Sequence, residues 1–406
     1  MGDGQNMASA EIPIEKKHKK VRRGNKGKDR YRNNTDEISV IHMNIRGIKS
    51  KVRDITSLSE EMQPDLMIFS ETKLCNEESR NIKGYKKHYL NRTTRAGGVI
   101  IYYKKDMDVQ LLKKNAECET LWVNVKGKGE DLAIGGIYSP CEDNISKAGI
   151  SDIVRELEKD FMEIKENKTH KILLVGDMNA HVGNDKDGII GNNEKIGTNG
   201  KEYRRFWKEN DLILCNNTPK CKGKWTRIAG DSKAILDLTL ATEDAFKMMK
   251  SIEIDEANKY SIESKKAKTD HNATIITINM KVEKEMKKKK EIIRCNGNWT
   301  AFNDVLQAEL QKVTSYDTLE SAIQKASKKI ISKEYKVPGE PKVFGYNKVL
   351  KDEIKNRRNL CTDWKKEKNL ERKKELEDLY LAQKQKVNDL MDHLEAEEVQ
   401  KIIERK

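Results

Sequence analysis

Polar residues able to do chemistry stand where apolar runs of this sequence end. The run Lys171–Val175 is followed by Gly176-Asp177-Met178-Asn179-Ala180-His181. In an extended chain, residues i and i+2 project to the same side, so Asp177 and Asn179 can address one bound group together. A carboxylate beside a carboxamide suits polarising a water molecule and holding a charged oxygen. The same residue types also dominate ordinary turns, so this segment alone leaves both interpretations open.

Other β-rich runs are bordered by the same kinds of residue. Asn44 follows residues 39–43, Glu71 follows 66–70, Tyr138 follows 132–137, and Thr269-Asp270-His271 precede 273–278. Binding and catalytic residues concentrate on the loops that a rigid scaffold positions. Polar residues at the ends of several strands therefore predict a functional site, whereas a polar residue at the end of a single strand would predict only a turn.

Taken in order, these segments resemble the endonuclease/exonuclease/phosphatase superfamily, and within it the endonuclease of non-LTR (LINE-type) retrotransposons. The resemblance covers roughly residues 38–280. Its motifs are Asn44, Ser70-Glu71-Thr72, Tyr138, Gly176-Asp177-Met178-Asn179, Leu236-Asp237-Leu238 and Thr269-Asp270-His271. Two stretches, Gly97–Tyr103 and Gly200–Asn217, resemble the retrotransposon branch in particular. The sequence departs from the family pattern at Ser70, Leu238 and Thr269, and none of these changes removes a titrating group.

The fold expected for residues 38–280 is of the α/β class, because β-rich runs alternate there with amphipathic helical stretches. We expect helices at Lys51–Met62, Ser151–Ile164 and Tyr203–Asn210. The family resemblance further implies a four-layer α/β sandwich, in which two packed mixed β-sheets are flanked by helices. Periodicity alone does not choose that architecture.

The chain divides into four segments by composition. Residues 1–37 form a basic tail that we expect to be disordered, and 38–280 form the endonuclease/exonuclease/phosphatase domain. Residues 281–344 form a basic linker with short helices near Thr300–Val313 and Leu319–Ile331. Residues 345–406 form a charged amphipathic helical region, either one long helix or a helical hairpin. The resemblance places a reverse transcriptase beyond this region, and since none follows, the chain resembles an N-terminal fragment or a truncated copy.

Charge points to an anionic partner. Charged residues make up 36% of the 406 residues and the formal net charge is +14, with most of the excess outside residues 38–280. Basic flanks around a near-neutral domain suit tethering to DNA, and to RNA as well. Within the tail, Lys16–Arg23 is typical either of a nuclear import signal or of a phosphate-binding arm.

Seven cysteines are scattered without a Cys-x-x-Cys pair or a zinc-like spacing to histidine. This pattern, with no signal peptide, indicates a reducing compartment, the nucleus or the cytoplasm. No run of about 18 apolar residues occurs, so we expect no membrane span. The sequence leaves the oligomeric state open.

Hydrolysis of a phosphodiester needs an aligned water, a counter-charge for the pentacovalent state and help for the leaving oxygen. A hard divalent ion held by oxygen ligands supplies the counter-charge, and we predict Mg²⁺, with Mn²⁺ as the alternative. Glu71 is the first predicted ligand, assisted by Asn44 and Asp270.

The remaining strand-end residues receive catalytic roles. Asp177 would orient or deprotonate the attacking water, and Asn179 would bind a phosphoryl oxygen. His271 would be the cationic or acid group near the phosphate, because imidazole titrates near neutrality. Asp237 would fix the tautomer of His271, and Tyr138 would donate to the phosphate. The other histidines in these motifs are expected to have lesser parts: His42 packs inside its strand, and His181 is structural or touches substrate.

Three functions follow from this interpretation. The first is a Mg²⁺-dependent DNA endonuclease that nicks one strand and leaves a 3′-hydroxyl, which the resemblance implies would prime reverse transcription. The second is another member of the superfamily, either a nuclease acting at abasic sites or a phosphoinositide phosphatase. The third is a catalytically inactive relic that binds nucleic acid without cutting it.

Overall fold

The structure is a computed structural model, and it describes residues 36–167, 171–183, 196–263, 269–283, 290–295, 298–328, 331–336 and 346–404. The predicted disordered tail, 1–37, lies outside the described residues except for its last two positions. The basic segment Lys16–Arg23 lies outside them too.

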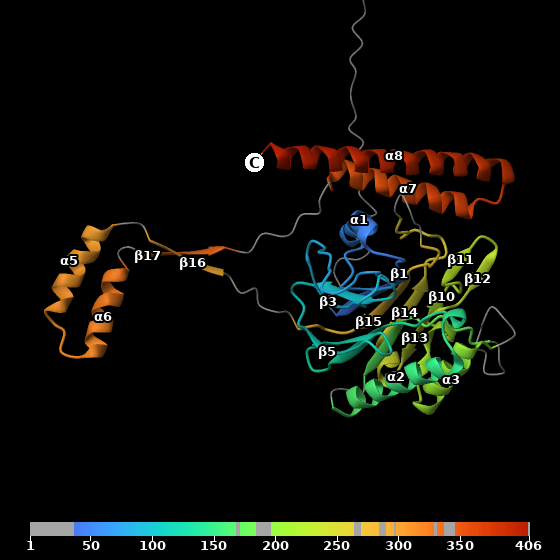
Figure 1. The fold of residues 1–406 in the computed structure, drawn as a ribbon, viewed down its shortest axis with the longest axis horizontal. Helices are drawn as coiled ribbons and strands as arrows, with labels where there is room; N and C mark the ends of the chain where they lie inside the picture. Colours follow the sequence, from blue (N-terminus) through green and yellow to red (C-terminus); the bar gives the residue numbers. More distant parts are fainter. Residues whose placement is uncertain are drawn as a thin grey trace, which may run out of the picture. The chain divides into compact units, whose positions relative to one another are not determined.

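Two mixed β-sheets form the centre of the fold (Figure 1). The first sheet has seven strands, in the order β10 (Cys221–Lys222), β14 (Met249–Ile254), β15 (Thr274–Asn279), β1 (Glu37–Asn44), β2 (Leu66–Ser70), β4 (Val99–Lys104) and β3 (Tyr85–Leu90). The second sheet has six strands, in the order β5 (Val109–Asn115), β6 (Thr120–Val125), β7 (Leu132–Tyr138), β8 (Ile172–Asp177), β13 (Asp237–Ala241) and β9 (Ile213–Leu214). Parallel pairs, β1 with β2 and β7 with β8, lie at the middle of each sheet.

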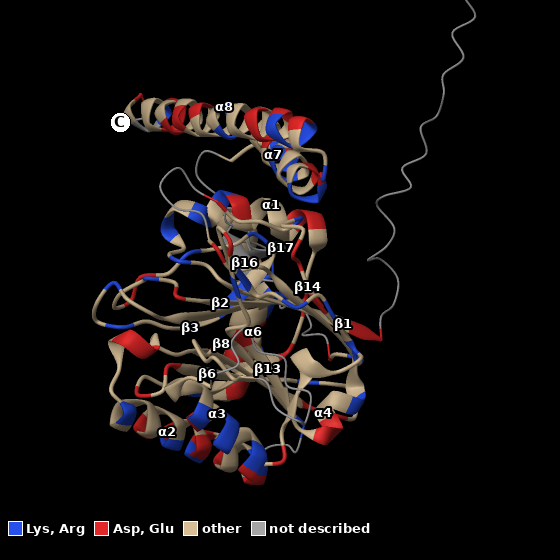
Figure 2. Cartoon of the chain, turned by 90° about the vertical axis from the view of Figure 1, so that its right-hand side faces the viewer, with Lys and Arg blue, Asp and Glu red and all other residues tan. Residues whose placement is uncertain are grey.

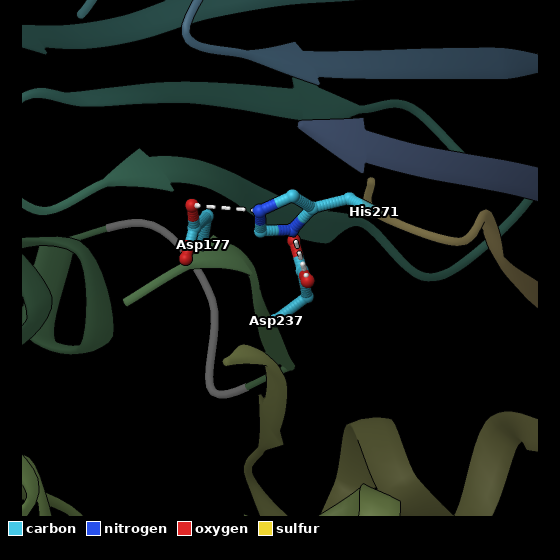
Figure 3. A group of neighbouring side chains, drawn as sticks. All are labelled: Asp177, Asp237 and His271. Carbon is cyan, nitrogen blue, oxygen red and sulfur yellow. Dashed lines mark hydrogen bonds and ion pairs between the residues drawn. The ribbon is translucent and has the colours of Figure 1, made fainter. Parts of the chain in front are cut away.

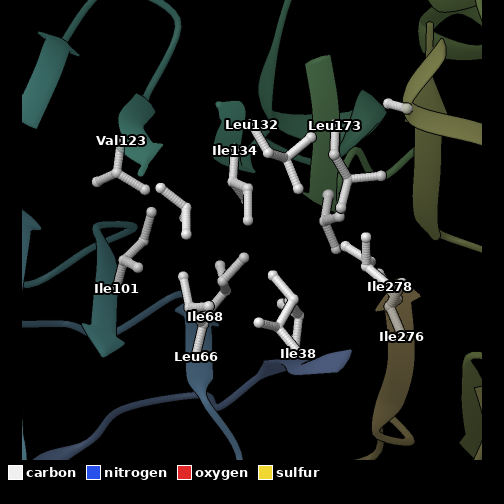
Figure 4. Packing of buried hydrophobic residues seen from close by; sticks show 14 of the residues in the cluster. Ile38, Leu66, Ile68, Ile101, Val123, Leu132, Ile134, Leu173, Ile276 and Ile278 are labelled. Carbon is white, nitrogen blue, oxygen red and sulfur yellow. The ribbon is translucent and has the colours of Figure 1, made fainter. Parts of the chain in front are cut away.

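Alternate residues of the central strands face opposite layers, as the two-residue period of a strand requires. In β2, Leu66 and Ile68 belong to the cluster between the sheets, while Met67 and Phe69 belong to the cluster under α1. Figure 4 shows the inter-sheet cluster, where Leu66 and Ile68 of one sheet meet Ile134 of the other. Central strands such as β2 and β8 are buried along their whole length because helices cover their outer faces.

Helices form the two outer layers. Helix α1 (Val52–Met62) covers the first sheet, and α2 (Lys147–Asn167) and α3 (Thr198–Glu209) cover the second. All three overlap the helices predicted from the sequence. Their outward faces carry intermixed Lys, Arg, Asp and Glu, as Figure 2 shows for α2 and α3. The predicted α/β class and four-layer sandwich are confirmed.

Shorter elements connect these layers. They are η1 (Lys49–Lys51), η2 (Glu142–Asn144), η3 (Cys215–Asn217), the hairpin of β11 (Arg227–Ala229) and β12 (Ser232–Ala234), and α4 (Glu243–Met248). In the described part of the chain, none of the helices is long and apolar enough to cross a membrane.

The segment after the sandwich contains strands that we did not predict. β16 (Lys290–Cys295) pairs antiparallel with β17 (Ile331–Lys336). Between them in sequence lie α5 (Trp299–Leu310) and α6 (Tyr316–Ser327), close to the two predicted short helices. The side chain of Ser315 caps α6 by accepting from the backbone N–H of Thr318.

The C-terminal region is a helical hairpin of α7 (Lys348–Lys366) and α8 (Leu370–Ile403). Its small apolar core contains Leu350, Ile354, Val387 and Met391. Polar residues interrupt the apolar face of α8 where it contacts α7, and one carboxylate accepts hydrogen bonds from both of them. Glu353 accepts from Gln383 Nε2 at 2.7 Å and from Lys386 Nζ at 2.8 Å.

Buried polar contacts join this hairpin to the sandwich. Arg357 donates to Asp54 Oδ2 of α1 at 2.5 Å, and Tyr380 donates to both carboxylate oxygens of Glu263 at 2.9 Å. Arg358 donates to the backbone carbonyl oxygens of Asp54 at 2.8 Å and Ser261 at 3.1 Å. All six of these residues are buried, so the contact is a specific one.

Candidate active site

Strand register brings the predicted residues of the second sheet together. Asp177 is the last residue of β8 and Asp237 the first of β13, and the two stand opposite one another in the antiparallel pair. Tyr138, the last residue of β7, stands opposite Asp177 in the parallel pair. In the first sheet, Asn44 at the end of β1 is in register with Ser70, so Glu71 follows at the same end.

Asp177 is linked to the first sheet by a hydrogen bond. Asn44 Nδ2 donates to Asp177 Oδ2 at 2.7 Å, and the backbone N–H of Asn179 donates to Asp177 Oδ1 at 3.0 Å. Burial raises the pKa of Asp177 to about 7, although the charge on His271 acts in the opposite direction. This carboxyl group can therefore accept or release a proton near neutral pH.

His271 lies between two carboxylates (Figure 3). Its Nδ1 is 2.7 Å from Asp237 Oδ2, and its Nε2 is 3.9 Å from Asp177 Oδ2. Burial alone would lower the pKa of His271, but the charges of Asp237 and Asp177 outweigh it and raise that pKa to about 9. Burial likewise acts to raise the pKa of Asp237, and His271 outweighs it, so the pKa of Asp237 falls below its usual value. The pair is thus a hydrogen-bonded imidazolium and carboxylate at neutral pH.

The amide of Asn179 is fixed by its neighbours. Its Nδ2 donates to the carbonyl oxygen of Ser139 at 2.7 Å, and its Oδ1 accepts from Cys141 Sγ at 3.4 Å. The backbone of Asn179 has φ +45°, a conformation that asparagine adopts more readily than most residues. Asn179 is buried beside Asp177, as the i, i+2 spacing predicts.

Tyr138 is half-buried at the same edge. Burial raises the pKa of its hydroxyl, and the nearby charges of Glu71 and Asp177 raise it further. The hydroxyl is therefore a proton donor for hydrogen bonds at any physiological pH. Because both carboxylates act on this one hydroxyl, negative charge from both sheets converges there.

The predicted metal ligands have different surroundings. The carboxylate of Glu71 contacts the exposed ammonium of Lys73 at 2.8 Å, and the Glu71 side chain is 17% exposed. Asp270, in contrast, is held between two guanidinium groups, with Arg46 at 2.9 Å from Oδ1 and Arg227 at 2.8 Å from Oδ2. Burial acts to raise the pKa of Asp270, but the charges of His271, Arg46 and Arg227 keep it low. Both oxygens of Asp270 thus already have cationic partners.

Two sets of side chains fit a cation to different degrees. Asp177, Asp237 and His271 offer ligand atoms that all lie within 4.8 Å of one another. A metal, however, needs a neutral histidine nitrogen, whereas the charges of Asp237 and Asp177 raise the pKa of His271 to about 9 and so disfavour its neutral form. Glu71 offers a partly accessible carboxylate of the kind that hard cations prefer. The chemistry of the donor atoms therefore favours Glu71 over the histidine-containing set.

His42 makes a contact that the sequence did not predict. We expected it to pack in the core, and it is indeed buried on β1, but it lies against Asp237. Its Nδ1 is 3.8 Å from Asp237 Oδ1, and its Nε2 is 3.2 Å from Ser70 Oγ. The signal was present in the spacing, because His42 precedes Asn44 by two positions and so projects to the same side of β1. Burial lowers the pKa of His42 to about 4, so its imidazole is neutral at physiological pH.

Comparison with known families adds to this geometry. Residues 132–275 match the family model described as "Endonuclease-reverse transcriptase", Exo_endo_phos_2. The matched range contains Tyr138, Asp177, Asp237 and His271. The chain is thus similar to this family over residues 132–275. No curated protein sequence matches the chain.

Several solved structures are similar to part of the chain. The endonuclease domain of TRAS1, a telomere-specific non-LTR retrotransposon, is 13% identical with a TM-score of 0.44, over 60% of this chain and 99% of that one. The AP endonuclease LMAP of Leishmania major is 13% identical with a TM-score of 0.46, over 60% of this chain and 88% of that one. The catalytic domain of Xenopus laevis APE2 is 13% identical with a TM-score of 0.47, over 62% and 94%. At such identities these likenesses say nothing about substrate.

Proposed function

We propose that the chain is a divalent-metal-dependent phosphodiester hydrolase, a DNA endonuclease that nicks one strand and leaves a 3′-hydroxyl. The observation that carries this proposal is the position of His271, whose Nδ1 lies 2.7 Å from Asp237 Oδ2 and whose Nε2 faces Asp177 across 3.9 Å. That separation is too long for a hydrogen bond, so the Nε2–H of His271 is available to a phosphoryl oxygen. A fixed cation beside a carboxyl group of pKa about 7 suits hydrolysis of an anionic ester.

Glu71 and Asn44 would hold the ion in this proposal, which we take as Mg²⁺, with Mn²⁺ as the alternative. Asn44 Oδ1 accepts the backbone N–H of Arg46 at 3.0 Å, and a carbonyl oxygen has a second lone pair free for a cation. Asp270 would assist through its charge, since Arg46 and Arg227 occupy its oxygens. When bound, the ion supplies positive charge to the scissile phosphate.

The chain's own residues divide the remaining work. Asp177 orients the attacking water and takes its proton as the water oxygen bonds to phosphorus. Asn179, fixed by Ser139 and Cys141, would hold a phosphoryl oxygen with the amide N–H that otherwise donates weakly to Asp177 Oδ2 at 3.3 Å. His271 supplies positive charge, or a proton, as the bond between phosphorus and the 3′-oxygen breaks. Tyr138 donates a hydrogen bond to the phosphate.

DNA is the proposed partner, and the basic flanks would bind RNA as a second contact. The net charge of +14 favours a polyanion over a small anionic substrate. The matched family description names an endonuclease with a reverse transcriptase, which favours a retrotransposon role in target-primed reverse transcription. The domain division at residues 37, 280 and 344 is part of the same proposal.

A supercoiled-plasmid assay with Mg²⁺, with Mn²⁺ and with a chelator tests the proposal. We expect wild type to convert supercoiled plasmid to open circles, and His271→Ala and Asp177→Ala to be slower by about 10²- to 10⁴-fold. His88→Ala is the matched control, because His88 lies on β3 and contacts Tyr103 instead of the site. Nicking that survives either site substitution would refute the assigned roles.

The same assay separates the other functions. DNA binding without cleavage by wild type would favour the relic. Cleavage confined to a duplex with an abasic site would favour a repair nuclease. Hydrolysis of inositol phosphates with intact DNA would favour the phosphatase.

A further inference from the structure

Two polar atoms behind the catalytic pair face each other without hydrogen-bond partners. Asp237 uses Oδ2 for His271, and the hydroxyl of Thr226 also acts on this carboxylate, while its Oδ1 is buried without a well-formed hydrogen bond. His42 Nδ1 is also buried and unpaired, and it lies 3.8 Å from that oxygen. A buried polar atom without a partner is costly, so two such atoms facing one another call for an explanation.

The tautomer of His42 determines whether its Nδ1 presents an N–H or a lone pair to Asp237. A neutral imidazole has one N–H donor and one acceptor nitrogen. Ser70 Oγ lies 3.2 Å from Nε2 and can donate its hydroxyl hydrogen there. The N–H then sits on Nδ1 and points at Asp237 Oδ1, an oxygen that only accepts. The opposite tautomer would set a nitrogen lone pair against a carboxylate.

We propose that His42 is a positioning residue for His271, acting through the second oxygen of Asp237. This inference rests on the proposed function. A carboxylate contacted at one oxygen only can turn about its side-chain bond. The N–H dipole of His42, 3.8 Å from the second oxygen, is too far for a hydrogen bond but favours one plane of the carboxylate electrostatically. His42 would thereby fix the direction in which Asp237 presents Oδ2 to His271.

Strand β1 then controls both acids beside the catalytic histidine. Its Asn44 donates to Asp177, and its His42 faces Asp237, two positions earlier on the same side of the strand. Both acids come from the second sheet, so a single strand of the first sheet orients them together. Ser70 extends the chain of contacts to β2, the strand that ends beside Glu71.

The test compares His42→Phe, which keeps a ring but has no nitrogen, with His42→Asn, whose amide nitrogen can replace the Nδ1 donor. Plasmid nicking gives kcat and KM for each variant. We expect His42→Phe to lose about 10- to 100-fold in kcat with unchanged KM, the usual effect of removing an outer partner of a site residue. His42→Asn should recover part of that loss. His88→Phe, a matched change on β3, should leave kcat unaltered.

A measurement on the resting protein separates failure of this inference from failure of the proposed function. The ring N–H resonance of His271, identified by its absence in His271→Ala, reports the bond to Asp237 in protein with isotope-labelled histidine. We expect His42→Phe to shift or broaden it and His42→Asn to restore it, whether or not wild type nicks DNA. An unmoved resonance in His42→Phe overturns the inference, as does a kcat equal to wild type. If wild type does not nick, the proposed function falls while the resonance still decides the role of His42.

Discussion

Replacing Arg357 by methionine tests how the helical hairpin is held to the sandwich. Arg357 is 1% exposed and Asp54 is 0% exposed, and they form an ion pair at 2.5 Å. Asp54 Oδ2 also accepts the backbone N–H of Glu263 at 2.8 Å, so the carboxylate cannot move out to solvent freely. Without Arg357 the acid becomes a buried charge that lacks its strongest partner.

The expected cost follows from that geometry. Removing one member of a buried ion pair typically destabilises a protein by about 3–5 kcal/mol, because the remaining charge is uncompensated. Methionine has similar length to the arginine stem, so little of the loss comes from a cavity. We expect Arg357→Met to lose about 3 kcal/mol of unfolding free energy. Adding Asp54→Asn should return part of this loss, a coupling of about 1–3 kcal/mol.

Urea unfolding followed by both fluorescence and circular dichroism measures the effect. Trp364 of α7 stacks on Tyr380 of α8, so the part of the fluorescence signal that Trp364→Phe removes reports on the hairpin, while circular dichroism reports on the whole chain. Transitions that separate in Arg357→Met would mean that the hairpin detaches before the sandwich unfolds. Arg372→Met is the control, because its bond to Glu375 is exposed and should be worth under about 1 kcal/mol. A loss in Arg357→Met no larger than in this control would refute the reasoning.

Three further predictions follow from the site and its supports. Glu71→Gln should weaken Mg²⁺ binding measured by calorimetry and slow nicking by about 100-fold, because a neutral amide is a poorer ligand for a hard cation; unchanged binding would return the ion to the histidine-containing set. Asp255 is buried and its pKa is raised to about 6, above its unfolded value, so its charged form is disfavoured in the fold. Wild type should therefore lose about 2 kcal/mol of stability relative to Asp255→Asn as the pH rises from 4 to 6, and a difference that is flat with pH would contradict this. Gly176→Ala should lose about 1–3 kcal/mol of stability and should nick more slowly, because a methyl group there would collide with the backbone carbonyl of Ile137. Thermal unfolding and the plasmid assay measure the two effects, and wild-type values in both would contradict the prediction.

The ends of strands were the part of this protein most open to prediction from sequence. A polar residue at the end of a strand must lie at the end of the sheet. The pairing register of neighbouring strands then determines which of these residues lie opposite one another. Asp177, Asp237 and Tyr138 meet for this reason. Their roles stay predictions, whereas the sandwich that aligns them is confirmed.

Contacts between segments that are distant in the sequence could not be predicted from it. Nothing local to Asn44 indicates that it will donate to Asp177, 133 residues away. Nor does the sequence around Asp270 predict that Arg46 and Arg227 will take its two oxygens. Strands β16 and β17 were not predicted for a similar reason. They pair with each other across a long, charge-rich stretch of sequence that has no hairpin turn to indicate the pairing.

The site depends on how the two sheets pack, because neither sheet holds it alone. Asn44 belongs to the first sheet, the segment Thr269–His271 precedes its strand β15, and Asp177 and Asp237 belong to the second sheet. Thr269 Oγ1 donates to the backbone carbonyl of Asn44 at 2.6 Å, which attaches the histidine segment to β1. A slip between the sheets would then alter the bond from Asn44 to Asp177 and the bond from His271 to Asp237 together. The apolar cluster between the sheets, far from any substrate, is in this sense what sets the distances on which catalysis would depend.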